Sequence, residues 1–357
     1  MNFRRVSLVN YRNISHARID LDSRRVFLHG ANGQGKTNFL EALSLATALR
    51  PFRTHENRII IGPDREQSEA RFEIECEREG ESVVDVRIKR SGKEVKLDSK
   101  PVRRLSDFVG RFPTVVLSSN DLQLTKGAPG GRRRYFDTFI CGVDRDYFAS
   151  LQQYQKLVQE RNALMRSEER DSVVAAFEMQ MDRPALKIYR SRNKVVSELL
   201  QIAEPIYENL SGKSEKMGIE YAFSSEMEKE GDFLETLNRN RKRDRYLQST
   251  SQGPHRDDYG LFVNGLPASD YASEGQQRSI TLALSLAIIQ YWSERKGLLP
   301  VALADDAFAE LDTVRRERFW EMLDENMQLI ATGTQVPAVC RSGEWETVAV
   351  ENGCFGD

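Results

Sequence analysis

One stretch decides the fold of this 357-residue chain: Gly30-Ala31-Asn32-Gly33-Gln34-Gly35-Lys36-Thr37. It is a complete G-x-x-x-x-G-K-[ST] pattern, which is typical of a phosphate-binding loop. The apolar run Val26-Phe27-Leu28-His29 before it predicts a buried strand, and apolar residues at helical spacing after it predict a helix that Pro51 ends. The motif therefore lies between a strand and a helix N-terminus, where its chemistry requires it.

Each residue type in the predicted loop has a role. Glycines let the backbone wrap closely, so that N–H groups point inward at phosphate oxygens, and the dipole of the following helix adds positive potential. Lys36 is expected to reach the outer phosphates and to take part in catalysis, and the Thr37 hydroxyl is expected to hold Mg²⁺. The predicted nucleotide-binding residues are Gly30, Ala31, Asn32, Gly33, Gln34, Gly35, Lys36, Thr37 and Asn38. The expected ligands are ATP and Mg²⁺.

The composition is that of an ordinary soluble protein and gives no global sign of nucleic-acid binding. Charged residues make up 30% and hydrophobic residues 39%, and the net charge is −2. Any DNA site must therefore be a local patch. The first residues show no signal-peptide pattern, and no apolar run approaches membrane-spanning length. Four scattered cysteines fit a reducing cytosol and argue against zinc, so we expect a cytoplasmic protein without a membrane partner.

Strand and helix signals are distributed so that they predict two lobes. Strands are predicted at 3–9, 17–21, 72–76, 84–88, 95–97, 113–117, 259–263, 301–304 and 328–331. Helical spacing dominates 147–210, where Pro184 is expected to start or interrupt a helix and Pro205 to kink one. We therefore predict an α/β head formed by residues 1–130 and 250–357, with residues 131–249 inserted as a helical arm.

Asp305 and Asp306 follow a predicted core strand. An acid at the carboxyl end of such a strand is where a Mg²⁺-holding carboxylate belongs, and a neighbouring carboxylate can polarise the attacking water. We expect Asp305 to hold Mg²⁺ together with Thr37, and Asp306 to be the catalytic residue that orients water. The phosphate loop upstream disfavours the alternative, a pair of solvated turn acids.

The string Ser273-Glu274-Gly275-Gln276 opens a helix that is apolar nearly all round. Alone, it fits an N-cap serine with a tight turn. The order of phosphate loop, S-x-G-Q, acid pair and Ala309-Glu310-Leu311-Asp312 resembles the ATPase head of ABC-type proteins, a mixed sheet with helices and an antiparallel meander. In such heads the S-x-G-Q of one subunit closes on the γ-phosphate held by the other. The resemblance implies an ATP-dependent homodimer in which Ser273, Gly275 and Gln276 bind nucleotide.

Further strings make the chain resemble the bacterial RecF family. They are Asn10-Tyr11-Arg12-Asn13, Phe52-Arg53-Thr54, Lys126-Gly127-Ala128-Pro129, Gly253-Pro254-His255-Arg256-Asp257-Asp258, and Asp305-Asp306 where most ABC heads carry Asp-Glu. The resemblance implies a DNA replication and repair protein that binds DNA, dimerises with ATP, and acts as a weak, DNA-stimulated ATPase switch. The implied partners are RecR and RecO, with which such proteins help RecA to load at single-strand gaps and support the SOS response.

Two positions depart from the family pattern. Ser118-Ser119-Asn120-Asp121-Leu122 stands where Ser-Pro-Glu-Asp-Leu is usual, and this string contains no Gln to sense Mg²⁺. Thr332-Gly333-Thr334 occupies the place of the switch histidine of other ABC heads. These departures concern the rate of hydrolysis more than the binding of ATP.

Two basic clusters could follow DNA phosphates. They contain the predicted DNA-binding residues Arg132, Arg133, Arg134, Arg241, Lys242 and Arg243. Arginine forks pair well with phosphate, but each cluster fits equally well a solvated helix face, because the chain balances 52 basic against 54 acidic residues. The sequence leaves this choice open.

Two other functions share parts of the pattern. An ATPase subunit of a membrane transporter would carry the same loop and acids, but it normally has Asp-Glu and a switch histidine. A structural, SMC-like chromosome-organising head would need a long heptad arm, whereas the segment from Tyr147 to Leu210 spans at most ~90 Å before folding back.

Overall fold

The structure, a computed structural model, divides the chain into two compact units. It describes residues 1–48, 56–62, 64–118, 122–167, 170–212, 215–306, 313–336 and 345–356. The first unit comprises Met1–Asp121, Ile206–Ser214 and Arg278–Asp357, and the second comprises Leu122–Pro205 and Glu215–Gln277. Several quoted strings lie outside the described residues: Pro51 to Thr54, Ser119 to Asp121, and Ala307 to Asp312.

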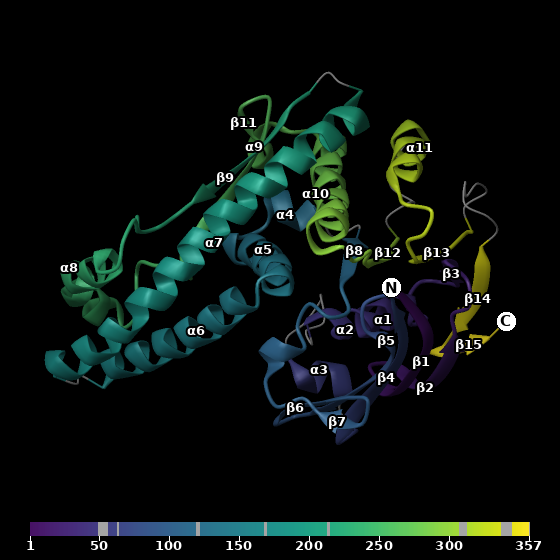
Figure 1. The fold of residues 1–357 in the computed structure, drawn as a ribbon, viewed down its shortest axis with the longest axis horizontal. Coiled ribbons are helices and arrows are strands. Elements are labelled where there is room, and N and C mark those ends of the chain that lie inside the picture. The colour runs from purple at the N-terminus through teal and green to yellow at the C-terminus, as the bar shows by residue number, and fades with distance from the viewer. Residues whose placement is uncertain are drawn as a thin grey trace. The chain divides into compact units, whose positions relative to one another are not determined.

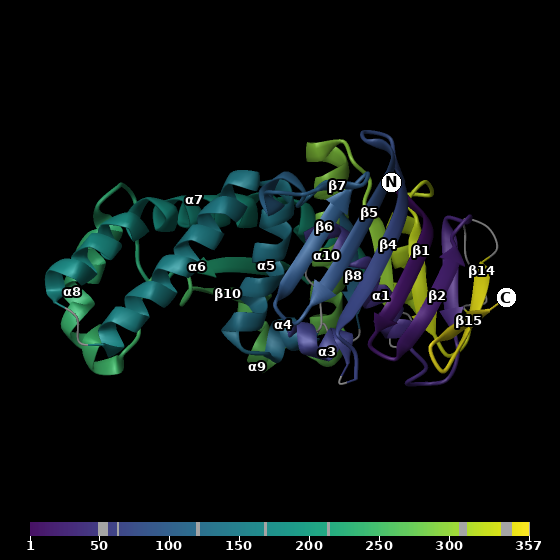
Figure 2. The same ribbon diagram turned by 90° about the horizontal axis from the view of Figure 1, so that it is seen from below.

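The first unit contains an antiparallel sheet with strand order β2-β1-β4-β5-β6-β7. Its strands are β1 (Asn2–Tyr11), β2 (Ile14–Asp20), β4 (Gln67–Cys76), β5 (Gly80–Lys89), β6 (Gly92–Leu97) and β7 (Lys100–Pro101). Figure 2 shows the long strands β1, β4 and β5 side by side. Burial alternates along β4, because successive side chains point to opposite faces of the sheet. The predicted meander with one buried face is thereby confirmed.

A second sheet in the same unit has strand order β15-β14-β3-β13-β12-β8. Its strands are β3 (Arg25–His29), β8 (Thr114–Ser118), β12 (Val301–Asp305), β13 (Leu329–Gly333), β14 (Glu346–Glu351) and β15 (Cys354–Gly356). All neighbours are parallel except β14 and β15. Because parallel strands end at one edge, the carboxyl ends of β3, β13 and β12 meet there, with His29 opposite Gly333 and Asp305 opposite Thr332.

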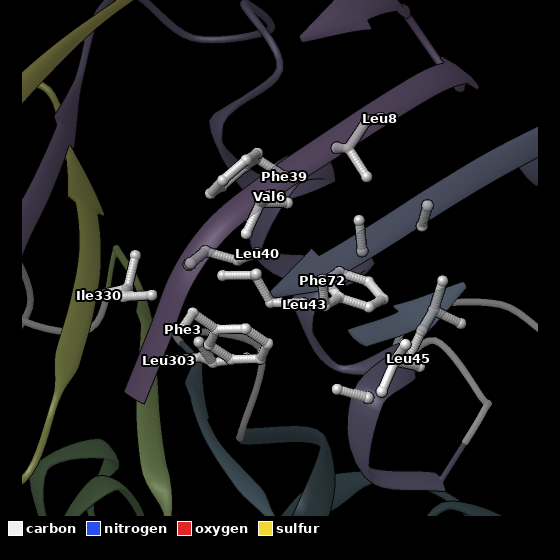
Figure 3. Packing of buried hydrophobic residues seen from close by; sticks show 14 of the residues in the cluster. Phe3, Val6, Leu8, Phe39, Leu40, Leu43, Leu45, Phe72, Leu303 and Ile330 are labelled. Atoms are coloured by element: carbon white, nitrogen blue, oxygen red, sulfur yellow. The ribbon is translucent and has the colours of Figure 1, made fainter. Parts of the chain in front are cut away.

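The helix α1 (Lys36–Leu43) contributes to the core that the two sheets share. Its buried residues Phe39, Leu40 and Leu43 belong to one cluster with residues of both sheets: Val6, Leu8, Phe72, Leu303 and Ile330. Figure 3 shows these side chains packed together. Full burial of each such side chain stabilises the fold by roughly 1.5–3 kcal/mol relative to exposure. This packing fixes the N-terminus of α1 at the edge where the parallel strands end. The other helices that lie wholly in this unit are α2 (Leu45–Ala48), α3 (Asn57–Ile61), η1 (Leu105–Asp107) and α11 (Thr313–Met322).

The second unit is mainly helical but includes a small sheet. Its helices are α4 (Leu122–Lys126), α5 (Pro129–Val143), α6 (Arg145–Arg166), α8 (Asp232–Leu247) and α9 (Ala268–Tyr271), together with most of α7 (Asp171–Ser211) and the start of α10 (Glu274–Lys296). The sheet has the order β11 (Leu266–Pro267), β10 (Asp258–Val263), β9 (Met217–Ala222). The hairpin predicted at Asn264-Gly265 joins β10 to β11. Strand β9, inside the stretch expected to be a helical arm, was not predicted.

The helix α7 runs unbroken through two prolines. The expected start or interruption at Pro184 is wrong, since α7 extends from Asp171 to Ser211 with Pro184 and Pro205 inside it. A proline removes one helical N–H donor. The buried neighbours Met181, Ala185 and Ile188 continue the apolar face past Pro184, and this packing offsets the missing hydrogen bond. The chain leaves the second unit directly after Pro205.

Candidate nucleotide-binding site

The phosphate-loop motif forms the turn between β3 and α1, as its sequence predicts. Gly35 is the N-cap residue of α1, with φ of 117° and no side-chain cap among the described residues. Gly30 lies against β14, where a Cβ atom would come within 2.3 Å of the Val350 carbonyl oxygen. Both positions therefore require glycine. The uncapped first turn of α1 leaves backbone N–H groups that can bind an anion.

The Lys36 side chain is held at the loop. Only 4% of its surface is exposed, and Nζ donates hydrogen bonds to the carbonyl oxygens of Gly30 at 2.7 Å and Ala31 at 2.9 Å. Among the described residues its hydrogen bonds thus go to carbonyls rather than to a carboxylate. A buried ammonium group without a countercharge favours an anionic ligand.

Thr37 and Asp305 are brought together by the fold. The Thr37 hydroxyl donates a hydrogen bond of 2.7 Å to Oδ1 of Asp305, the last residue of β12. Asp305 is 6% exposed, and the Thr332 hydroxyl donates to the same oxygen at 3.0 Å. A hydroxyl and a carboxylate are the oxygen ligands that Mg²⁺ prefers, so Thr37 and Asp305 fit the expected metal. The described residues hold no group of three His, Cys, Asp or Glu side chains that could bind a metal.

Asp306 continues from β12 with a left-handed backbone. Its φ is 51°, and its N–H donates to the Thr332 hydroxyl at 3.1 Å. Aspartate tolerates this conformation better than most residues. Thr332 therefore contacts both acids, the side chain of Asp305 and the backbone of Asp306. In the sequence, Thr332 was noted only as one of the residues at the place of the switch histidine. Its contacts with Asp305 and Asp306 were not predicted, because the register between β12 and β13 cannot be derived from residue spacing.

Two turns support the loop from outside. Asn13, in the turn between β1 and β2, accepts a hydrogen bond from Asn38 at 2.7 Å. Gln34 binds the turn between β14 and β15: its carbonyl accepts from the Gly353 N–H at 2.8 Å, and its Oε1 accepts from the Asn352 N–H at 2.6 Å. The side chain of Gln34, predicted to bind nucleotide, thus holds the protein's own backbone. Asn352 and Gly353 had no signal in the sequence.

The S-x-G-Q string forms a capping box at the start of α10. The Ser273 N–H donates to Oε1 of Gln276 at 2.7 Å, and the Gln276 N–H donates to the Ser273 hydroxyl at 3.3 Å. Gly275 lies in the first turn, and Gln276 also donates to Glu215 at 2.9 Å. Ser273 therefore acts as the N-cap of α10, as the string alone indicated. Because the Ser273 hydroxyl accepts in this arrangement, its own hydrogen can still be donated to an anion.

The first basic cluster, on α5, has internal partners at two of its three positions. Arg132 pairs with both carboxylate oxygens of Asp258 at 2.7 Å, and Arg133 donates to the Asp257 carbonyl at 2.6 Å. Arg134 is exposed. The cluster as a whole is therefore less available to phosphates than its sequence suggests.

The second basic cluster, on α8, divides in a similar way. Arg241 forms an ion pair with the buried Glu178, whereas Lys242 and Arg243 are exposed. Of the residues predicted to contact DNA, only Arg134, Lys242 and Arg243 are exposed.

Two residues of the Gly-Pro-His-Arg-Asp-Asp string, His255 and Asp257, bind other residues of the second unit. Nε2 of His255 contacts the Thr250 carbonyl at 3.0 Å, and Nδ1 contacts the Tyr154 hydroxyl at 2.8 Å. Since the carbonyl can only accept, Nε2 carries the proton. Burial lowers the pKa of His255 to about 4. Asp257 is fully buried and pairs with Arg192 at 3.1 Å.

The fold and the site together define the ATPase head of ABC-type proteins. Residues 2–354 match the family described as RecF/RecN/SMC N terminal domain. A DNA replication and repair protein RecF from Leptospira interrogans is 33% identical over 95% of this chain and 93% of its own length. The RecF from Exiguobacterium sp. is 33% identical over 95% and 94%, and that from Geobacter sulfurreducens 31% over 96% and 95%. The chain belongs to the RecF family of DNA replication and repair proteins.

Solved structures give the same result. A structure described as the recombination mediator protein RecF-ATP in the RecFOR pathway is similar with a TM-score of 0.90 and 26% identity, covering 99% of this chain and 96% of that one. An Smc head with a TM-score of 0.54 and 14% identity, covering 99% and 97%, shares the fold. Among the described residues, no helix is both long and apolar enough to cross a membrane.

Proposed function

We propose that this protein is an ATP-gated, DNA-binding dimer of replication and recombinational repair. It binds ATP with Mg²⁺, closes as a homodimer on the nucleotide, binds DNA at single-strand gaps, and opens after slow hydrolysis. The observation that carries the proposal is the hydrogen bond between Thr37 and Asp305 beside a complete phosphate loop. The similarity to RecF over 95% of the chain favours this function over a transporter subunit or a chromosome-organising head.

ATP binding follows from the loop geometry. The N–H groups of the uncapped first turn of α1 bind the phosphates, and Gly35 lets the chain enter that turn. Lys36 exchanges the carbonyls of Gly30 and Ala31 for the outer phosphate oxygens, which place a countercharge beside its ammonium group. Thr37 and Asp305 would hold Mg²⁺, which neutralises phosphate charge when bound.

Hydrolysis needs a water molecule oriented toward the γ-phosphate. Asp306 is proposed to accept a proton from that water, and Thr332 fixes the backbone from which its side chain extends. Ser273 of the second subunit is proposed to donate its hydroxyl hydrogen to the same phosphate. Water orientation by one carboxylate, without a switch histidine, is in keeping with a weak, DNA-stimulated ATPase that acts as a switch.

The proposed partners are DNA, RecR and RecO, and the proposed role is to help RecA load at gaps in the cytoplasm. The names of the curated relatives and the description of the similar structure in a RecFOR pathway support this assignment.

The mass of the purified protein in solution tests the proposal. Light scattering after gel filtration is expected to give a monomer with ADP and a dimer with ATP, and gapped DNA is expected to co-elute with the dimer. The Lys36→Ala variant serves as the control, because it removes the cation at the loop and is expected to stay monomeric with ATP. A wild-type protein that remains monomeric with ATP and DNA would contradict the proposal.

A further inference from the structure

The helix α8 has two faces of different character. Figure 1 shows α8 in the second unit, at the end where α6 and α7 meet. Its inner face buries Phe233, Leu237 and Asp244. Asp244 pairs with the fully buried Arg161 at 2.8 Å. These contacts fix the rotation of α8, so that its opposite face must point to solvent.

The basic residues on the inner side of α8 are neutralised. Arg241 pairs with Glu178, and Arg245 pairs with Asp171 at 2.6 Å. Glu178 is itself buried against Arg161. Arg241 therefore belongs to the buried ion-pair network of the second unit, and Arg245 is paired with Asp171 at its surface.

The outer side of α8 carries a different set, which we call the outer stripe: Arg239, Lys242, Arg243 and Tyr246. Their spacing of three, four and seven residues places them along one face of the helix, over about 10 Å. All four are exposed, and Tyr246 at 88% is the most exposed large apolar or aromatic side chain among the described residues.

The outer stripe concentrates positive charge on a chain whose net charge is −2. Among the described residues, no ion pair involves Arg239, Lys242 or Arg243. Glu235, one turn before Arg239, is the nearest exposed acid along the helix. Cations next to an aromatic ring in open solvent are the combination that binds single-stranded nucleic acid, in which cations follow the phosphates and a base stacks on the ring.

We propose that the outer stripe binds single-stranded DNA, with the three cations on phosphates and a base stacked on Tyr246. This inference rests on the proposed DNA-binding function and adds the surface and the strand form. Bases in a duplex are stacked on each other and present only their edges, so Tyr246 distinguishes single strands from duplex. An acidic peptide would engage the cations but would leave the ring without a role.

The test compares variants of the full-length protein by fluorescence anisotropy, with labelled oligo-dT and a duplex of equal length. Tyr246→Ala is expected to weaken oligo-dT binding about 5- to 150-fold, the loss of one stacked base, and to leave duplex binding unchanged. Changing Arg239, Lys242 and Arg243 together to Gln is expected to reduce the slope of log affinity against log salt by about 0.7 for each DNA phosphate that the variant no longer neutralises.

A matched control removes the same charge elsewhere in the second unit. Lys156, Arg183 and Lys194 are 76%, 89% and 74% exposed, and each lies beside a glutamate, so their replacement by Gln is expected to change little. In a cross-linking experiment, oligo-dT that contains 5-iododeoxyuridine is expected to attach to Tyr246. Circular dichroism and urea unfolding check that each variant is folded.

The outcomes separate the two proposals. If Tyr246→Ala and the triple Gln variant bind oligo-dT as wild type does, while wild type binds DNA, the inference is overturned and the proposed function stands. If the triple variant loses oligo-dT and duplex alike while Tyr246→Ala binds both as wild type does, the assignment to single strands is overturned. If neither variant changes oligo-dT binding but polyglutamate binds wild type and not the triple variant, the stripe serves an acidic protein instead. If wild type binds neither DNA, both proposals fail.

Discussion

The Thr37 hydroxyl and the Asp305 carboxylate, 268 residues apart in the chain, are joined by a hydrogen bond of 2.7 Å. Thr37 lies in α1, which follows β3 and the phosphate loop, and Asp305 ends β12; β13 lies between β3 and β12 in the sheet. Thr332 of β13 fills this position and donates to the same carboxylate oxygen. Thr332 therefore helps to orient the carboxylate of Asp305, one of the two expected Mg²⁺ ligands.

Replacing Thr332 by Val is expected to weaken the dependence of ATP binding on Mg²⁺. Valine keeps the shape of threonine but removes the hydroxyl that orients Asp305 and accepts from the Asp306 N–H. Loss of such an outer partner of a metal ligand typically lowers metal affinity about 10- to 100-fold. Titration of a fluorescent ATP analogue at a series of Mg²⁺ concentrations measures the effect.

Thr332→Ser is the control for this experiment, because serine keeps the hydroxyl. Its Mg²⁺ dependence is expected to lie close to that of wild type. Equal behaviour of the Val variant and wild type would show that Asp305 is oriented without Thr332.

A substitution at Ser273 can separate its two roles. Aspartate and asparagine cap a helix about as well as serine, so both variants are expected to keep the α10 N-terminus. Ser273→Asp brings a negative charge to the γ-phosphate of the other subunit and is expected to abolish ATP-driven dimerisation, whereas neutral Ser273→Asn is expected to weaken it less. Both are expected to bind ATP as monomers.

Gel filtration with light scattering, in ATP and in ADP, gives the dimer fraction of each variant. If Ser273→Asp dimerises at the same ATP concentration as wild type, Ser273 does not contact the γ-phosphate of the other subunit and serves only to cap α10.

The sequence predicts the parts of this fold whose signals are local. The loop, its flanking strand and helix, and the acids at the end of β12 could be placed because the residues that form each feature are adjacent in the chain. Contacts between residues far apart in the chain could not be predicted. Thr332 contacts Asp305 because of the register between β12 and β13, and Gly353 binds Gln34 although the two residues lie near opposite ends of the sequence. For the same reason the sequence did not reveal the ion pair of Arg132, whose partner Asp258 lies 126 residues away in the chain.

Two errors in the second unit have a similar cause. Strand β9 is short and has no motif, so its pairing with β10 is visible only in the fold. The helix break expected at Pro184 follows from local propensity, which the buried packing of α7 overrides.

His255 is expected to make stability depend on pH. Burial lowers its pKa to about 4, whereas an unfolded chain has about 6.5. Between these values the unfolded state binds the proton and the folded state does not, so stability falls as pH falls. From pH 7.5 to 5.5 the loss is on the order of 1 kcal/mol from this residue. Urea unfolding at both pH values measures it.

The His255→Gln variant isolates this contribution from those of other titrating groups. It is expected to be less stable at pH 7.5 and to show a smaller change between the two pH values than wild type. An identical pH dependence in both proteins would mean that His255 takes up its proton in the folded state.

Asp306→Asn is expected to stabilise the closed, ATP-bound dimer. The φ of 51° at this position suits asparagine as well as aspartate, so the backbone is kept and only the charge is removed. Losing a water-activating carboxylate slows chemistry by about 10²–10⁴-fold. ATP binding is expected to survive, because Lys36, Thr37 and Asp305 are unchanged, whereas Asp305→Asn is expected to lose Mg²⁺-dependent binding. The measurement is the lifetime of the dimer and of its DNA complex after dilution, and dissociation of Asp306→Asn as fast as wild type would mean either that Asp306 does not orient the water or that hydrolysis does not release DNA.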